Sequence, residues 1–78
     1  MKYTNAMNLK ELRKKAGLSA EQVAATLGKA HSTVRNWESG KSRPTLDISD
    51  TVQICKLYSC TLKELEEAVN ETAKGGFK

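Results

Sequence analysis

The segment from residue 19 to residue 40 constrains the fold of this chain more than any other, because it contains two short helical patterns separated by a turn. Ser19 begins the first pattern, and Gln22 follows three residues later, which is the spacing of a capping box. Apolar residues then recur at the spacing of one helix face, at Ala20, Val23, Ala24 and Leu27. Gly28 readily adopts the left-handed conformation that ends a helix and turns the chain.

The second pattern, about residues 30–39, has an apolar side and a polar side. Its apolar side is predicted to bury Ala30, Val34 and Trp37, and Gly40 ends it. Polar side chains project from the opposite side or flank it, namely His31, Ser32, Thr33, Arg35, Asn36 and Ser39. Two short helices joined at a steep angle by a tight glycine turn form a helix-turn-helix.

A further helix is predicted before this segment, from Leu9 to about Ala16. Asn8 is a favourable N-cap, and Glu11 stands at the capping-box position. The apolar stripe of this helix consists of Leu9, Leu12 and Ala16.

Two more helices are predicted after it. The first begins near Asp47 or Ser49 and runs to Tyr58, and its apolar side consists of Ile48, Val52 and Cys55, to which either Ile54 or Leu57 is an alternative addition. Thr61 caps the last helix, with Glu64 completing a capping box. The apolar face of the last helix consists of Leu62, Leu65, Val69 and Ala73. With no strand pattern in the sequence, the prediction is an all-α fold of five helices.

The length of 78 residues allows one domain. We expect residues 1–7 to be a loosely ordered N-terminus, residues 8–73 to be the helix-turn-helix domain, and residues 74–78 to be a flexible tail. No run of residues is apolar enough for a membrane span or a signal peptide. Cys55 and Cys60 lack the spacing of metal ligands, and we expect both to be buried and reduced.

The net charge is distributed unevenly along the chain. Residues 1–44 carry nine Lys and Arg against three Asp and Glu, a net charge of +6, whereas residues 45–78 carry four against six, a net charge of −2. The basic half is the half that contains the helix-turn-helix. This asymmetry predicts that a polyanion binds to one face of the domain.

Several short motifs of the chain occur together in one family of DNA-binding domains. They are Leu18-Ser19, Val23-Ala24, Leu27-Gly28, Ser32-Thr33-Val34, Trp37-Glu38-Ser39-Gly40-Lys41 and Arg43-Pro44. Through these motifs, about residues 8–70 resemble the lambda-repressor-like (Cro/XRE) family. The resemblance implies a five-helix fold whose third helix enters the major groove of DNA. Three positions depart from the usual family residues, namely Ala20, Lys29 and Ala30.

The resemblance also implies base contacts from the polar side of residues 30–39. The predicted base-contact residues are His31, Ser32, Thr33, Arg35 and Asn36. The chemistry of two of them suits base recognition, because Arg35 can donate twice to guanine O6 and N7, and Asn36 can pair with adenine N6 and N7.

Phosphate contacts are predicted on both sides of the third helix. The free N–H groups at the start of the second helix favour an anion, and the loop after the third helix is basic. The predicted phosphate-contact residues are Ser19, Gln22, Lys29, Ser39, Lys41, Ser42 and Arg43. Contacts of this kind position a protein on DNA without reading the base sequence.

Glu38 lies beside Trp37 at the edge of the predicted buried face, where an unpaired carboxylate is costly. Arg13 occupies the matching edge of the first helix. Since the corresponding positions form a salt bridge in the family, the resemblance implies an ion pair between Arg13 and Glu38 that joins the first helix to the third.

Together these observations predict sequence-specific binding of double-stranded DNA by a transcriptional regulator, a repressor of bacterial or phage type that is cytoplasmic and nucleoid-associated. We expect no catalysis, cofactor, metal, membrane or small-molecule ligand, since the sequence has no metal cluster, no nucleophile–base arrangement and no glycine-rich phosphate loop. A weak homodimer is expected on a pseudo-palindromic site, paired through the last helix or the loop before it. Tyr58, Leu62 or Val69 are the candidates for this contact, and the alternative is that the same residues belong to the core.

Three alternative functions share this fold. The chain would be the DNA-binding antitoxin of a toxin–antitoxin pair if a toxin co-purifies with it. It would be a protein-interaction domain if it has lost DNA binding. It would be a nonspecific RNA or nucleoid binder if duplex of random sequence competes for the protein as well as any particular sequence does.

Overall fold

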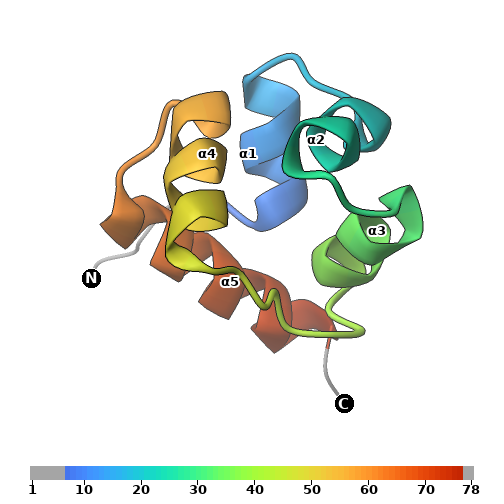
Figure 1. Cartoon of the computed structure of the whole chain (residues 1–78). Coiled ribbons are helices and arrows are strands. Elements are labelled where there is room, and N and C mark those ends of the chain that lie inside the picture. The colour runs from blue at the N-terminus through green and yellow to red at the C-terminus, as the bar shows by residue number, and fades with distance from the viewer. Residues whose placement is uncertain (1–6, 77–78) are drawn as a thin grey trace.

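The structure, a computed structural model, describes residues 7–76, and this part of the chain contains five α-helices and no strand. The helices are α1 (Leu9–Lys15), α2 (Ala20–Leu27), α3 (His31–Ser39), α4 (Ile48–Tyr58) and α5 (Leu62–Gly76). Figure 1 shows α5 running beneath the other helices, with α3 and α4 on opposite sides. The predicted all-α, five-helix fold is confirmed. The predicted loose N-terminus, except for its last residue, and residues 77–78 of the predicted tail lie outside the described residues.

The hydrophobic core lies where one face of each helix meets the others. Its buried residues are Leu9, Leu12, Val23, Ala24, Val34, Trp37, Ile54, Tyr58, Leu65 and Ala68. Val23 and Val34, one from each helix of the helix-turn-helix, are the largest fully buried side chains. The core therefore fixes α2 and α3 against each other and against the rest of the domain.

Capping boxes begin three of the five helices. At the start of α2, the Ser19 hydroxyl accepts the Gln22 N–H at 3.1 Å, and the Gln22 side-chain oxygen accepts the Ser19 N–H at 2.7 Å. The same reciprocal pairs join Asn8 to Glu11 and Thr61 to Glu64. All three predicted boxes are confirmed. Gly28 ends α2 with a φ of +69°, the left-handed conformation expected of this turn.

A hydrogen bond across the fold ties the start of α1 to α5. The N–H of Leu9, in the first turn of α1, donates to the buried Thr72 hydroxyl at 3.0 Å, and that hydroxyl donates to the Ala68 carbonyl at 2.8 Å. The first N–H groups of a helix have no partner within the helix. Thr72 therefore accepts a hydrogen bond from the Leu9 N–H, a buried donor that has no partner within α1.

The core side predicted for α4 is only partly correct, since Cys55 packs against the core but Ile48 and Val52 do not. Ile54 and Tyr58 are buried, whereas Ile48 and Val52 are 85% and 49% exposed. At 3.6 residues per turn, Ile48 and Val52 lie roughly 120° around the helix from the buried pair. Because Tyr58 is only 5% exposed, it belongs to the core, which was the alternative to its role in a dimer surface.

Three smaller predictions also differ from the structure. Ala30 is exposed because it is the N-cap of α3 and lies before the first turn, where no side chain caps the helix. Leu62 is 64% exposed because it is the first residue of α5 and lies beyond the core. Lys74 and the two residues after it continue α5, and the Lys74 ammonium lies 3.4 Å from the Glu71 carboxylate.

The two cysteines carry free thiols, as predicted, but they are half-buried rather than buried. The Cys60 N–H donates to the Cys55 carbonyl at 3.0 Å across the end of α4. Burial first, and then the neighbouring Cys55 thiol, raise the pKa of the Cys60 thiol to about 11. Cys60 is therefore a poor nucleophile at neutral pH.

Candidate nucleic-acid interface

The polar side of α3 faces away from the core. Val34 and Trp37, which are 1% and 4% exposed, hold the other side of the helix in place. Among the predicted base-contact residues, His31, Ser32 and Arg35 are exposed, and Thr33 and Asn36 are half-buried. α3 thus brings the five residues together along one accessible side and its edge.

The start of α2 supplies the group predicted to contact phosphate on one side of α3. The capping box uses the Ser19 hydroxyl and the Gln22 side-chain oxygen as acceptors, so the Ser19 O–H and the Gln22 amide nitrogen remain as donors that can face an anion. Both side chains are accessible, with Ser19 half-buried and Gln22 exposed. The positive end of the α2 dipole adds to this preference for negative charge.

The loop after α3 is folded against the end of that helix. The Asn36 carbonyl accepts the N–H of Lys41 at 3.0 Å and the N–H of Ser42 at 3.2 Å. The Ser39 hydroxyl donates to the same carbonyl at 3.2 Å. The side chains of Lys41, Ser42 and Arg43 are exposed. The backbone of Lys41 and Ser42 is therefore held against the end of α3, so the basic loop begins beside the polar side of that helix.

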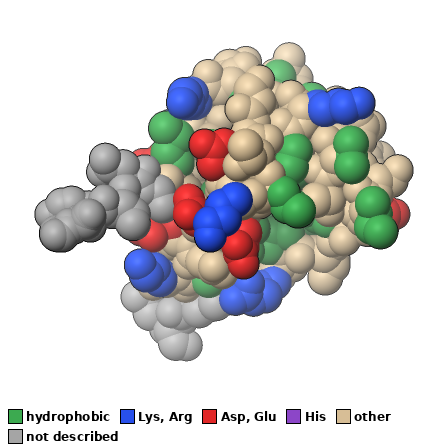
Figure 2. All heavy atoms as spheres, turned by 90° about the vertical axis from the view of Figure 1, so that its left-hand side faces the viewer, with side chains coloured by type: hydrophobic (Ala, Val, Ile, Leu, Met, Phe, Trp, Pro, Cys, Tyr) green, Lys and Arg blue, Asp and Glu red, His purple; other side chains and the backbone are tan. Residues whose placement is uncertain are grey.

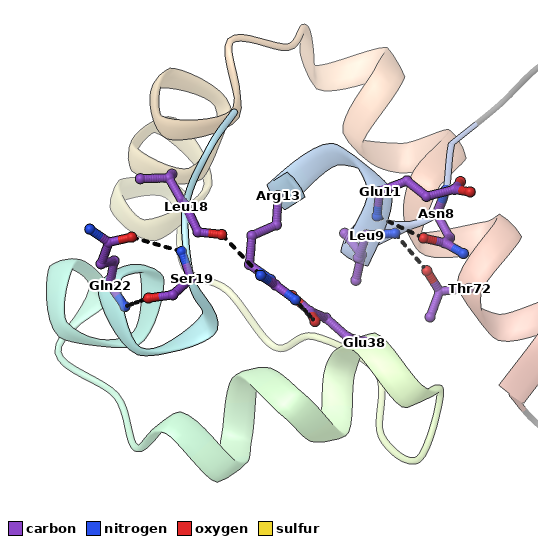
Figure 3. Close-up of polar contacts among 9 residues, drawn as sticks. All are labelled: Asn8, Leu9, Glu11, Arg13, Leu18, Ser19, Gln22, Glu38 and Thr72. Carbon is purple, nitrogen blue, oxygen red and sulfur yellow. Dashed lines mark hydrogen bonds and ion pairs between the residues drawn. The ribbon is translucent and has the colours of Figure 1, made fainter. Parts of the chain in front are cut away.

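An ion pair between Arg13 and Glu38 joins α1 to α3, in the place where the sequence predicted it (Figure 3). Arg13 Nε lies 2.6 Å from Glu38 Oε2, and Arg13 Nη2 lies 3.0 Å from Oε1. Arg13 Nη1 also donates to the Leu18 carbonyl at 2.9 Å. One guanidinium thus holds α1, the chain that leads into α2, and α3.

Both partners of this pair are largely removed from water. The side chains of Arg13 and Glu38 are 11% and 8% exposed. Hydrogen bonding to Glu38 raises the pKa of Arg13, against the opposing effect of burial. An arginine of this kind stays charged at every pH the protein meets, so the orientation of α3 does not depend on its titration.

A comparison with models of known protein families matches residues 9–65 to a helix-turn-helix family. The chain belongs to this helix-turn-helix family. The match supports the lambda-repressor-like (Cro/XRE) resemblance and identifies the domain as a DNA-binding domain of the kind found in transcriptional regulators. No curated protein and no solved structure matches the chain.

Two contacts of the helix-turn-helix domain were missed in the sequence analysis. The Glu21 carboxylate at the start of α2 lies 3.8 Å from His31 Nε2, beside the predicted base contacts. The Lys29 ammonium lies 3.4 Å from the Asp50 carboxylate of α4. Each pair joins residues from different helices or turns, and no local spacing in the sequence signals it. One predicted phosphate contact, Lys29, is therefore already paired in the free protein.

Within residues 7–76, no group of three or more His, Cys, Asp or Glu side chains is arranged to hold a metal ion. In the same part of the chain, no helix has both the length and the hydropathy needed to cross a membrane.

Proposed function

We propose that this domain binds double-stranded DNA in a sequence-specific manner and regulates transcription. The observation that carries the proposal is the division of α3 into two sides within a helix-turn-helix domain. Val34 and Trp37 anchor one side in the core, and polar side chains suited to base edges occupy the other. In this proposal α3 lies in the major groove, as the recognition helix of such domains does.

The proposal divides the contacts with DNA into two groups. The base contacts are His31, Ser32, Thr33, Arg35 and Asn36, with guanine as the preferred partner of Arg35 and adenine as that of Asn36. The phosphate contacts are Ser19, Gln22, Lys29, Ser39, Lys41, Ser42 and Arg43. Lys29 exchanges its ion pair with Asp50 for a phosphate oxygen, so it contributes less affinity than Lys41 does.

We further propose that the regulator is a repressor of bacterial or phage type that works in the cytoplasm on the nucleoid. Two copies bind a pseudo-palindromic site, because one such helix reads only a few base pairs. A two-fold axis presents the two recognition helices to successive turns of the major groove, about 34–36 Å apart. Binding of a site that overlaps a promoter then blocks transcription.

The test begins with selection of bound sequences from a pool of random duplexes, followed by affinity measurements on the selected site. Arg35→Ala should relax the preference at one base pair, with a loss of about 1–3 kcal/mol on the selected site. Lys41→Ala should weaken binding to all duplexes alike. Lys63→Ala, which removes the same charge from an exposed position on α5, is the matched control. It should change neither the base preference nor the affinity for duplex DNA.

The salt dependence of binding provides an independent check. Four to six phosphate contacts per copy predict a log–log slope of about −4 to −5, from roughly 0.9 counterions released per phosphate. A slope near zero, or a pool that yields no enriched sequence, would refute sequence-specific DNA binding.

A further inference from the structure

A surface cleft of about 480 Å³ lies where α1, α2 and α3 meet. Its lining residues are Lys10 and Arg13 of α1, Ala20 and Glu21 of α2, and Arg35, Glu38 and Ser39 of α3. α1 carries none of the phosphate contacts predicted from the sequence, so this wall of the cleft has no assigned role.

The ion pair between Arg13 and Glu38 lies deep in this cleft and connects two of its walls. Figure 3 shows Arg13 extending from α1 toward Glu38 of α3. The guanidinium of Arg13 donates to both carboxylate oxygens of Glu38 and to the Leu18 carbonyl. The two opposite charges therefore satisfy each other, and the pair adds no net charge to the cleft.

The other charged side chains of the cleft are Lys10, Arg35 and Glu21, and all three are exposed. Within residues 7–76, no carboxylate forms an ion pair with Lys10 or with Arg35. The Glu21 carboxylate lies 3.8 Å from His31 Nε2 instead. The cleft thus contains two positive charges without an acidic partner, one on α1 and one on α3.

The cleft opens beside the polar side of α3. Arg35, a proposed base contact, and Ser39, a proposed phosphate contact, belong both to that side and to the lining of the cleft. When a recognition helix occupies the major groove, the phosphate backbone that borders the groove passes close to the neighbouring helices of the domain. A phosphate group can therefore reach the cleft while α3 contacts the bases.

The side of the domain away from α3 has a different pattern of charge. Figure 2 views the side that α4 occupies in Figure 1, and acidic and basic side chains lie next to one another there, among hydrophobic ones. On α1 itself, Lys15 lines a second cleft, whose lining also includes Glu64 and Glu67 of α5. Lys15 therefore shares its cleft with two carboxylates, whereas Lys10 shares its cleft with the unpaired Arg35.

We propose that the cleft between α1, α2 and α3 holds a backbone phosphate of the bound DNA and that Lys10 contacts this phosphate. The proposal rests on the proposed function and extends the DNA interface from the helix-turn-helix onto α1. A lysine binds phosphate as a flexible point charge, so Lys10 adds affinity for duplex DNA without reading its sequence. Arg35 keeps its proposed role at a base edge, and Lys10 supplies the charge for the phosphate.

The affinity of the whole chain for the selected duplex and for an unrelated duplex, measured over a range of salt concentrations, tests the proposal. Lys10→Ala should weaken binding to both duplexes alike, by about five- to tenfold at roughly 0.1 M salt, because one phosphate contact fewer releases about 0.9 fewer counterions. The log–log slope should become less steep by the same 0.9 or so. Lys10→Arg keeps the charge and should bind with the slope of the wild type.

Lys15→Ala is the matched control, because it removes the same charge from the same helix at the other cleft. Its slope should equal that of the wild type. Since Lys10 and Lys15 are both exposed, both alanine variants should unfold at the wild-type temperature. Equal losses of affinity in the two variants would overturn the proposal, because the loss would then follow from net charge alone. An unchanged slope in Lys10→Ala would overturn it as well.

A free phosphate ion presents the same chemical group as the DNA backbone, so a second measurement separates the two. Replacement of chloride by inorganic phosphate at constant ionic strength should leave the affinity of the wild type for DNA unchanged. If phosphate displaces DNA from the wild type but not from Lys10→Ala, the cleft binds the free ion and the proposal is wrong. A wild type that binds no duplex would refute the proposed function itself. A wild type that binds duplex, with a Lys10→Ala variant that binds equally well, would refute only the contact of Lys10.

Discussion

Removal of the Glu38 carboxylate should destabilise the domain strongly. In Glu38→Ala, the guanidinium of Arg13 keeps one hydrogen bond, to the Leu18 carbonyl, and loses both contacts with the carboxylate. At 11% exposure, its charge cannot be fully rehydrated without movement of α1. Breaking one half of a buried ion pair costs about 3–5 kcal/mol, and the remaining hydrogen bond and partial exposure reduce the expected loss to about 2–4 kcal/mol.

Urea and thermal unfolding of the two proteins measure this loss. For a domain of this size, each kcal/mol lowers Tm by roughly 4–8 °C, so the change should be large. Glu66→Ala, which removes a carboxylate from an exposed position on α5, is the matched control and should unfold within about 0.5 kcal/mol of the wild type.

A double variant separates the cost of leaving one charge unpaired from the cost of losing side-chain volume. Arg13→Met combined with Glu38→Leu removes both charges and keeps similar volume, so its stability should return close to that of the wild type. The reasoning is wrong if Glu38→Ala unfolds like the wild type, because the two charges would then be free to reach solvent separately. It is also wrong if the double variant is as unstable as Glu38→Ala.

Three further predictions concern other contacts. Thr72→Val leaves the buried N–H of Leu9 without an acceptor and should lower the free energy of unfolding in urea by about 1–3 kcal/mol, whereas Thr72→Ser, which keeps the hydroxyl, should lose less. Glu21→Gln removes a negative charge beside the proposed DNA contacts and should tighten binding to all duplexes at low salt; equal dissociation constants at 50 mM salt would contradict this. Because the pKa of Cys60 is raised to about 11 in the folded state, its contribution to stability should be constant below about pH 9 and decline between pH 9 and 11, a loss that Cys60→Ala should reduce in pH-dependent unfolding.

Local features of the fold could be predicted from the sequence because their causes lie within a few residues. Ser19 and Gln22 are three residues apart and form the predicted capping box, and Gly28 has the predicted turn conformation. Val34 and Trp37 repeat at helical spacing beside polar residues, so their burial in α3 was predicted correctly, whereas that of Ala30 was not.

The buried side of α4 was predicted only in part because this short helix has apolar residues all around its circumference. Ile48, Val52, Ile54 and Leu57 together give no single face, and only packing against α1, α2 and α5 decides that Ile54 is buried and Ile48 is exposed. The same limit applies to contacts between distant residues. Leu9 and Thr72 are 63 positions apart, and no local sequence pattern around either residue predicts their hydrogen bond.

The bond between Leu9 and Thr72 also affects how the chain folds during synthesis. The helix-turn-helix leaves the ribosome early, but α1 lacks its partner until the second half of α5 has been translated. Until then, the Leu9 N–H lacks its acceptor, although α3 and α4 are already available to pack against α1. Contacts between α1 and α5 must await the synthesis of α5, so the domain completes its core only after that helix has been translated.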